Sequence, residues 1–158
     1  MTKHEEKAKE LFFQGFNCAQ AVFCAFADEL GIDERTAFAL SAPFGGGMGR
    51  MRQVCGTLSG AFMVLGALYG GYPPGDRDGK ASLYARVREI ASGFEAESGS
   101  ILCAELLRAH GLDPSPGGPP QERGKDFYIK RRVCVDSVAL SARLLDEYLE
   151  KQRKDDAQ

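Results

Sequence analysis

The sequence has no excess of charge of either sign. It contains 20 Lys and Arg residues against 22 Asp and Glu residues, for a net charge of −2. Proteins that bind nucleic acids usually carry a basic excess or a basic stripe, so we expect no nucleic-acid partner. Tryptophan is absent, only two histidines are present, and neither a Ser/His/Asp arrangement nor an acid–base pair of carboxylates stands out.

The N-terminal residues lack an export signal. The segment MTKHEEKAKE is charged and contains no apolar run that leads to a small-residue cleavage site. We therefore expect a cytoplasmic, reducing location, where structural disulfides are rare. Residues 54–74 lack charge and approach the length of a bilayer span. Their glycine, serine and threonine content favours a buried core helix instead, so we expect a protein that does not span a membrane.

Sustained strand-like alternation is also absent, and helical periodicity prevails nearly throughout. At 158 residues, the sequence predicts a single domain over residues 1–158. The expected fold class is all-α, a compact bundle of about six helices. Cap residues, glycines and prolines place the helical segments at about 2–14, 17–30, 34–41, 54–69, 76–97, 100–111 and 131–151, with a surface loop at 112–125 and a frayed tail at 152–158.

The five cysteines are an odd number, and no two of them form a C-x-x-C pair. Local spacing therefore gives no zinc-finger or thioredoxin signal. Cys24 falls in the middle of a predicted helix and is interpreted as a packing residue. The other four fall near predicted helix starts, where free N–H groups and the positive end of the helix dipole favour a thiolate. Four unrelated core cysteines are an equally open interpretation, because free cysteine is among the most buried residue types. The four are Cys18, Cys55, Cys103 and Cys134.

Glycines crowd one predicted loop, residues 44–50, shortly before Cys55. The loop lacks the P-loop arrangement and follows no predicted strand, so it gives little sign of nucleotide binding. We interpret it as a tight turn with close backbone approach, whose N–H groups could hydrogen-bond a sulfur. His110, at a predicted helix end, is interpreted as a partner of the helix dipole. The candidate cofactor-binding residues are Gly45, Gly46, Gly47, Gly49 and Gly56.

In order and spacing, these elements resemble a family of redox-active proteins named for the motif C…CGAxxG…C…C. The resemblance covers almost the whole chain and has one departure, Thr57 in place of alanine. It implies a small bacterial or archaeal protein with a redox-active or metal-associated role. The matching elements are Asn17-Cys18, the glycine loop 44–49, the segment 55–60 (CGTLSG), Gly99-Ser100 with Cys103 and Leu106-Leu107, and Cys134.

Three functions are open from the sequence. The first is thiol–disulfide or electron-transfer chemistry at the four cysteines, with an unidentified redox partner. The second is a zinc ion or an iron–sulfur cluster held by the same four, with the charge offset by Arg50, Arg52, Arg131 and Arg132. The third is a non-catalytic helical interaction module. A homodimer is a further expectation, because the apolar segment 54–69 is hydrophobic around much of its surface.

Overall fold

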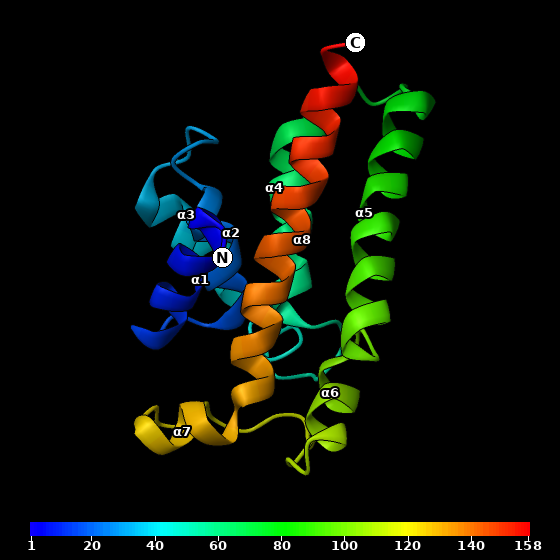
Figure 1. Ribbon diagram of the computed structural model, residues 1–158. Coiled ribbons are helices and arrows are strands. Elements are labelled where there is room, and N and C mark those ends of the chain that lie inside the picture. Colours follow the sequence, from blue (N-terminus) through cyan, green and yellow to red (C-terminus); the bar gives the residue numbers. More distant parts are fainter.

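The chain folds into eight α-helices and one short 3-10 helix in a computed structural model that describes residues 1–158 (Figure 1). The all-α prediction is confirmed, and the expected number of about six helices is too low. The sequence reading missed α7, which has only six residues and no side-chain cap. The elements are α1 (Lys3–Phe13), α2 (Cys18–Phe26), α3 (Glu34–Ser41), η1 (Ala42–Phe44), α4 (Gly56–Tyr69), α5 (Arg77–Ser98), α6 (Cys103–Ala109), α7 (Lys125–Lys130) and α8 (Arg132–Asp156).

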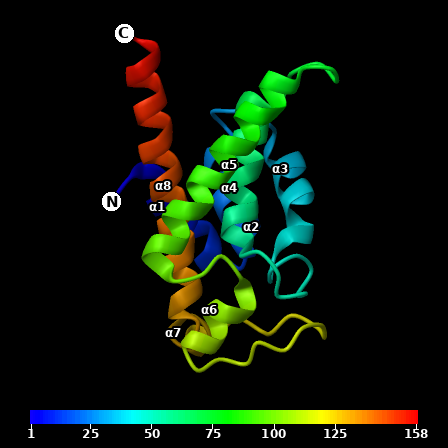
Figure 2. The ribbon, with the colours of Figure 1, turned by 90° about the vertical axis from the view of Figure 1, so that its right-hand side faces the viewer.

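Helices α1, α2, α4 and α8 surround the main hydrophobic core, and α5 packs along α4 and α8 (Figures 1 and 2). Helices α6 and α7 and the glycine loop lie at one end of the bundle, opposite the C-terminus (Figure 1). Helices α2 and α4 approach closely at Gly60, where a Cβ atom would lie 2.7 Å from the carbonyl oxygen of Ala19. Loops and the two short helices α6 and α7 thus close the end of the bundle opposite the C-terminus.

Side-chain caps explain where several helices begin. Thr2 and Asn17 form capping boxes with Glu5 and Gln20, and Asp33 caps α3. These helix starts agree with the sequence prediction. The expected cap at Ser100 is wrong, because Leu102 is extended and forms an isolated antiparallel bridge with Val54, so that α6 begins only at Cys103.

The C-terminal tail is helical, in contrast to the predicted fraying at 152–158. Helix α8 continues to Asp156. Glu150 lies within ion-pair distance of both Arg153 and Lys154, which supports the last turns. None of the helices combines the length and the apolar character needed to cross a bilayer. The uncharged stretch forms α4, a 14-residue helix with eight buried residues.

Candidate functional site

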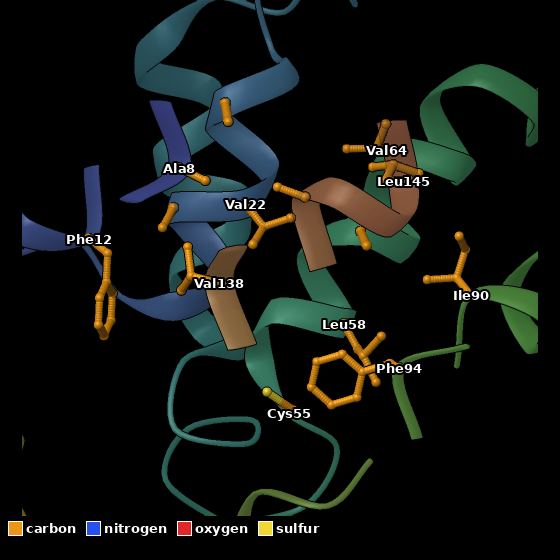
Figure 3. Close-up of a cluster of buried hydrophobic side chains, with 14 of the residues drawn as sticks. Ala8, Phe12, Val22, Cys55, Leu58, Val64, Ile90, Phe94, Val138 and Leu145 are labelled. Carbon is orange, nitrogen blue, oxygen red and sulfur yellow. The ribbon is translucent and has the colours of Figure 1, made fainter. Parts of the chain in front are cut away.

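The four cysteines that the sequence places at helix starts line one cavity of about 410 Å³. Cys18 and Cys103 are the first residues of α2 and α6, Cys55 is the N-cap of α4, and Cys134 is the third residue of α8. All are free thiols. Cys55 is buried at the beginning of α4, at the edge of the core beside Leu58 and Phe94 (Figure 3). Four helices far apart in the sequence thus direct one sulfur each toward a common space.

Cys24 lies elsewhere, as its place in the middle of a helix predicts. It belongs to a small separate cluster with Ala27 and Ala37. Its Sγ lies 3.9 Å from the Oγ of Ser41, and it does not line the cavity. Burial raises its pKa to about 11. Cys24 therefore serves as an internal reference, a buried thiol in this fold without access to the candidate site.

A two-residue antiparallel bridge joins the beginnings of α4 and α6. The N–H of Cys55 donates to the carbonyl of Ile101 at 2.8 Å, and the N–H of Cys103 donates to the carbonyl of Gln53 at 2.7 Å. Val54 and Leu102 face each other between these bonds. Because both cysteine backbones belong to the same bridge, the bridge sets the separation of the two helix starts.

Two glycines make room for two of the cysteines. At Gly56, a Cβ atom would collide with the Sγ of Cys18 and would lie 2.8 Å from the carbonyl oxygen of Phe44. At Gly47, a Cβ atom would lie 2.7 Å from the Cβ of Cys103. The predicted close backbone approach is therefore present. Of the five candidate glycines, all line the cavity except Gly47, which is buried against Cys103.

The glycine loop forms a left-handed turn rather than an ordinary tight turn. Its residues 46–50 all have positive φ, including the non-glycine residues Met48 at 68° and Arg50 at 61°. Arg52 follows at 59°. Such a conformation costs roughly 1–2 kcal/mol for each non-glycine residue. The turn is held by hydrogen bonds from the N–H groups of Arg52 and Gln53 to the carbonyls of Gly46 and Gly47. The chain thus maintains backbone strain at the wall of the cavity.

Three of the four cysteines at this site favour the thiol form, contrary to the thiolate that the helix starts predict. Burial raises the pKa of Cys18, Cys55 and Cys134, the last to about 11. The backbone N–H groups of Gly46 and Ala19 oppose this at Cys18 by hydrogen bonding to its sulfur, as the sequence suggested for the glycine loop. Removal from water outweighs the helix-start effect, because a charged sulfur loses more hydration than the N–H groups return.

The ionisation of each of these thiols also depends on its neighbours in the cavity. After burial, the next cause of the raised pKa at both Cys55 and Cys134 is a negative charge on Cys18. A charge on Cys103 raises the pKa of Cys18 and of Cys134 in the same way. Ionising one of these sulfurs therefore disfavours ionising the next.

Cys103 has a distinct partner. The Nη1 of Arg52 donates to its Sγ at 3.7 Å, and the Cys103 side chain is only half-buried. A guanidinium in this position stabilises negative charge on the sulfur it faces. Cys134 also hydrogen-bonds an arginine, Arg131, but burial outweighs that contact and raises its pKa.

Thr57, the departure from the motif, touches the site. Its Oγ1 accepts a hydrogen bond from the Oγ of Ser141 at 2.8 Å and lies 3.1 Å from the Sγ of Cys55. The hydroxyl therefore partners the most buried of the four sulfurs and opposes part of its raised pKa. The residue that departs from the motif therefore lies in contact with one of its cysteines.

Four arginines and no acidic residue line the cavity. The sequence singled out Arg50, Arg52 and Arg131, which are present, and Arg132, which is exposed and instead forms an ion pair with Asp136 at 3.0 Å. The fourth is Arg123, which the sequence reading missed because it comes from the loop before α7. Its Nη1 donates to the carbonyl of Phe16 at 2.6 Å and thereby ties that loop to the end of α1.

No three His, Cys, Asp or Glu side chains are arranged to hold one metal ion. A mononuclear zinc site at the four cysteines therefore does not fit this arrangement. His110 lies at the C-cap of α6, where its Nδ1 is 3.0 Å from the carbonyl oxygen of Leu106, and it does not line the cavity. Neither histidine takes part in the site.

Comparison with known proteins gives one match. Residues 16–148 match a family model described as "Putative redox-active protein (C_GCAxxG_C_C)". The matched region includes all four cysteines, the glycine loop and all four arginines of the cavity. No curated protein and no solved structure matches the chain.

Proposed function

The chain belongs to the C_GCAxxG_C_C family, and we propose that it performs reversible thiol–disulfide chemistry at the cysteines that line its cavity. One observation carries the proposal: four sulfurs from four separate helix starts face one space. Chance burial of cysteines gives scattered sites such as that of Cys24. A two-electron dithiol reaction needs two thiols that can meet, and a cavity lined by four can supply such a pair.

In this proposal, Cys103 is the attacking residue. Its sulfur is half-buried and faces the Arg52 guanidinium. As a thiolate, it attacks one sulfur of an acceptor disulfide RSSR, which forms a mixed disulfide and releases RS⁻. A second cysteine, Cys18 or Cys134, then attacks the Cys103 sulfur and releases the second RS⁻. Two protein thiols lose two protons and two electrons, and the acceptor disulfide gains the electrons.

Cys18 and Cys134 are the two candidates for the second step because the charge of Cys103 influences the pKa of both. Cys55 is buried against Thr57 and is influenced first by Cys18. We therefore assign Cys55 a supporting position behind Cys18. From there it attacks the first disulfide and, together with the remaining cysteine, takes over the S–S bond, so that the first pair returns to two thiols.

Mass spectrometry after alkylation tests this assignment. Reduced protein is exposed to a small disulfide, alkylated and digested, and each of the five cysteines is scored as free or paired. We expect a disulfide between Cys103 and either Cys18 or Cys134, while Cys24 stays alkylated. Equal numbers of free thiols with and without the disulfide would exclude the proposal.

An iron–sulfur cluster is the second candidate function, favoured by the four guanidinium groups that surround the same sulfurs. These cations could offset the negative charge of four thiolate ligands. Anaerobic purification followed by iron and sulfide analysis and a visible spectrum separates the two candidates. Stoichiometric iron that Cys103→Ser removes and Cys24→Ser does not would favour the cluster over the disulfide.

A further inference from the structure

The side chains that line the cavity carry positive charges and no negative ones, which thiol chemistry alone does not require. Arg50, Arg52, Arg123 and Arg131 line it, and none of them forms an ion pair with a carboxylate. No aspartate, glutamate or lysine lines it. Elsewhere on the molecule, Arg132, Arg143 and Arg153 have acidic partners and the other arginines form no ion pair, so what distinguishes the cavity is that four arginines gather around one space.

Two of these guanidinium groups are removed from water. Arg52 is 7% exposed and Arg131 is 8% exposed. Neither contacts a carboxylate. Arg52 donates to the carbonyl of Ser115 and the Sγ of Cys103, and Arg131 donates to the Oε1 of Gln121 and contacts the Cys134 thiol and the face of the Phe127 ring. A guanidinium has five N–H donors, so donors remain on both side chains. Buried charge without an opposite charge is costly, and proteins normally pair it.

The positive charges also repel one another. Burial and the charges of Arg52 and Arg131 lower the pKa of Arg50. Arg52 and Arg131 also lower the pKa of one acidic residue, Asp113, which is exposed, forms no ion pair and lies outside the cavity. Its lowered pKa comes first from hydrogen bonding to Ser115 and only then from Arg52 and Arg131. Asp113 also acts on Arg50 in the opposite direction, but burial and the two arginines outweigh it, so Asp113 offsets only part of the positive charge.

The backbone holds these arginines in place at a cost. Arg50 and Arg52 both have positive φ, at 61° and 59°. A glycine at either position would relieve the strain. Strained positions persist where the side chain they direct is needed. Here the strained positions carry the two arginines next to Cys103.

We propose that the cavity binds a small organic anion, held by the guanidinium groups of Arg52 and Arg131, and that the acceptor of the thiol reaction is therefore an anionic disulfide of low molecular weight. The identification of the acceptor rests on the proposed function, whereas the anion site rests on the arginines alone. Apolar walls and the volume of about 410 Å³ suit an organic body rather than a bare inorganic ion. These walls are formed by Phe12, Leu106, Leu107, Phe127 and Val133.

The position of Arg52 connects the proposed anion site with the proposed thiol reaction. Because the Nη1 of Arg52 reaches the Sγ of Cys103, a carboxylate bound by this guanidinium lies close to the attacking sulfur. The reaction consumes one dianionic disulfide and two protein thiols and yields one protein disulfide and two molecules of the anionic thiol. The arginines also stabilise the thiolate that leaves.

The first test measures binding without redox chemistry. Adipate has the chain length and the two carboxylates of dithiodiglycolate, with methylene groups in place of the sulfurs, and its binding to the reduced protein is measured by calorimetry. We expect binding that Arg52→Gln and Arg131→Gln weaken about tenfold. Arg131→Lys, which keeps the charge, should retain part of the affinity. Arg132→Gln removes the same charge one residue away, outside the cavity, and should bind as the wild type does.

The second test compares rate constants for three disulfides: dithiodiglycolate, which is anionic, bis-hydroxyethyl disulfide, which is neutral, and cystamine, which is cationic. We expect the wild type to prefer the anion over the neutral compound by about tenfold, and the neutral compound over the cation. The ratio of anionic to neutral rates should fall in Arg131→Gln and not in Arg132→Gln. This ratio cancels any change in the reactivity of the thiols themselves.

The outcomes separate the two proposals. Reaction with all three disulfides at similar rates, together with no adipate binding, would overturn the anion site and leave the thiol chemistry standing. Adipate binding that depends on Arg52 and Arg131, without reaction with any disulfide, would keep the anion site and reject the thiol function. Adipate binding that Arg132→Gln weakens as much as Arg131→Gln would also overturn the site.

Discussion

Arg131, just before α8, and Arg143, in the middle of the same helix, carry the same group in opposite surroundings. Arg143 lies against α5 and forms ion pairs with Glu97 and Glu147. Arg131 is more deeply buried and contacts no carboxylate: its partners are the amide oxygen of Gln121, the thiol of Cys134 and the ring of Phe127. The α5–α8 face thus has the balanced charge of an ordinary protein surface. At the cavity, the balance is left incomplete, which marks that end as a binding site.

The largest expected difference between the cavity and the rest of the molecule is in disulfide formation. Cys103→Ser should reduce disulfide formation with dithiodiglycolate to background, because it removes the attacking sulfur. Cys24→Ser, which alters a buried thiol away from the cavity, should react at the wild-type rate. Stopped-flow measurement of disulfide consumption gives both rates. Loss of reaction in Cys24→Ser, or full reaction in Cys103→Ser, would contradict the assignment of the site.

Two glycines on α4 provide the next largest contrast. Gly56→Ala should destabilise the fold by about 1–3 kcal/mol, because the new methyl group meets the Cys18 sulfur and the Phe44 carbonyl oxygen. Gly66→Ala has nothing within 4 Å and should stabilise the helix by up to about 1 kcal/mol. Urea unfolding gives both values. Equal effects at the two positions would mean that the cavity end of α4 is not tightly packed.

High pH should weaken the fold at the cavity. Burial raises the pKa of Cys134 to about 11, above its ordinary value of 9.0. The folded state therefore favours the thiol, and this contribution is present below about pH 9 and lost as the pH rises through 11. The melting temperature should fall over this interval, and Cys134→Ala should make the fall smaller. A slope unchanged by this substitution would show that the thiol is not protected from water.

The smallest expected effect concerns the arginines themselves. Arg143→Gln should cost about 0.5–1 kcal/mol, as expected for partly exposed ion pairs. Arg131→Gln should leave the stability of the ligand-free protein unchanged or raise it, because it relieves repulsion with Arg50. Thermal unfolding of both variants in the absence of organic anions checks this. A larger loss for Arg131→Gln would identify that guanidinium as structural.

Much of the fold follows from local chemistry that is visible in the sequence. Asn17 and Asp33 fix the starts of α2 and α3 because their side chains cap the next turn. The helix-start positions of the four cysteines follow from the same signals. The sequence could not reveal the raised pKa of Cys18, because burial depends on helices that meet only in the folded chain.

The four arginines that line the cavity were only partly predictable from the sequence, for the same reason. Arg50 and Arg52 stand out because they follow the glycine loop, but Arg123 lies in a proline- and glycine-rich segment without a pattern of its own. Its hydrogen bond to the Phe16 carbonyl joins residues 107 positions apart. Likewise, the sequence predicts a turn at 44–50, but its left-handed form depends on hydrogen bonds closed by residues 52 and 53.

The loop between α6 and α7 passes the same end of the bundle as the glycine loop (Figure 2), and its attachment has a mechanical consequence. The Nε–H groups of Arg50 and Arg52 donate hydrogen bonds to the carbonyls of Gly117 and Ser115 in this loop. An anion that recruits these donors competes with the loop for them. When the anion binds, these arginines exchange hydrogen bonds to the loop for hydrogen bonds to the anion. Binding therefore loosens the loop that forms part of the cavity wall.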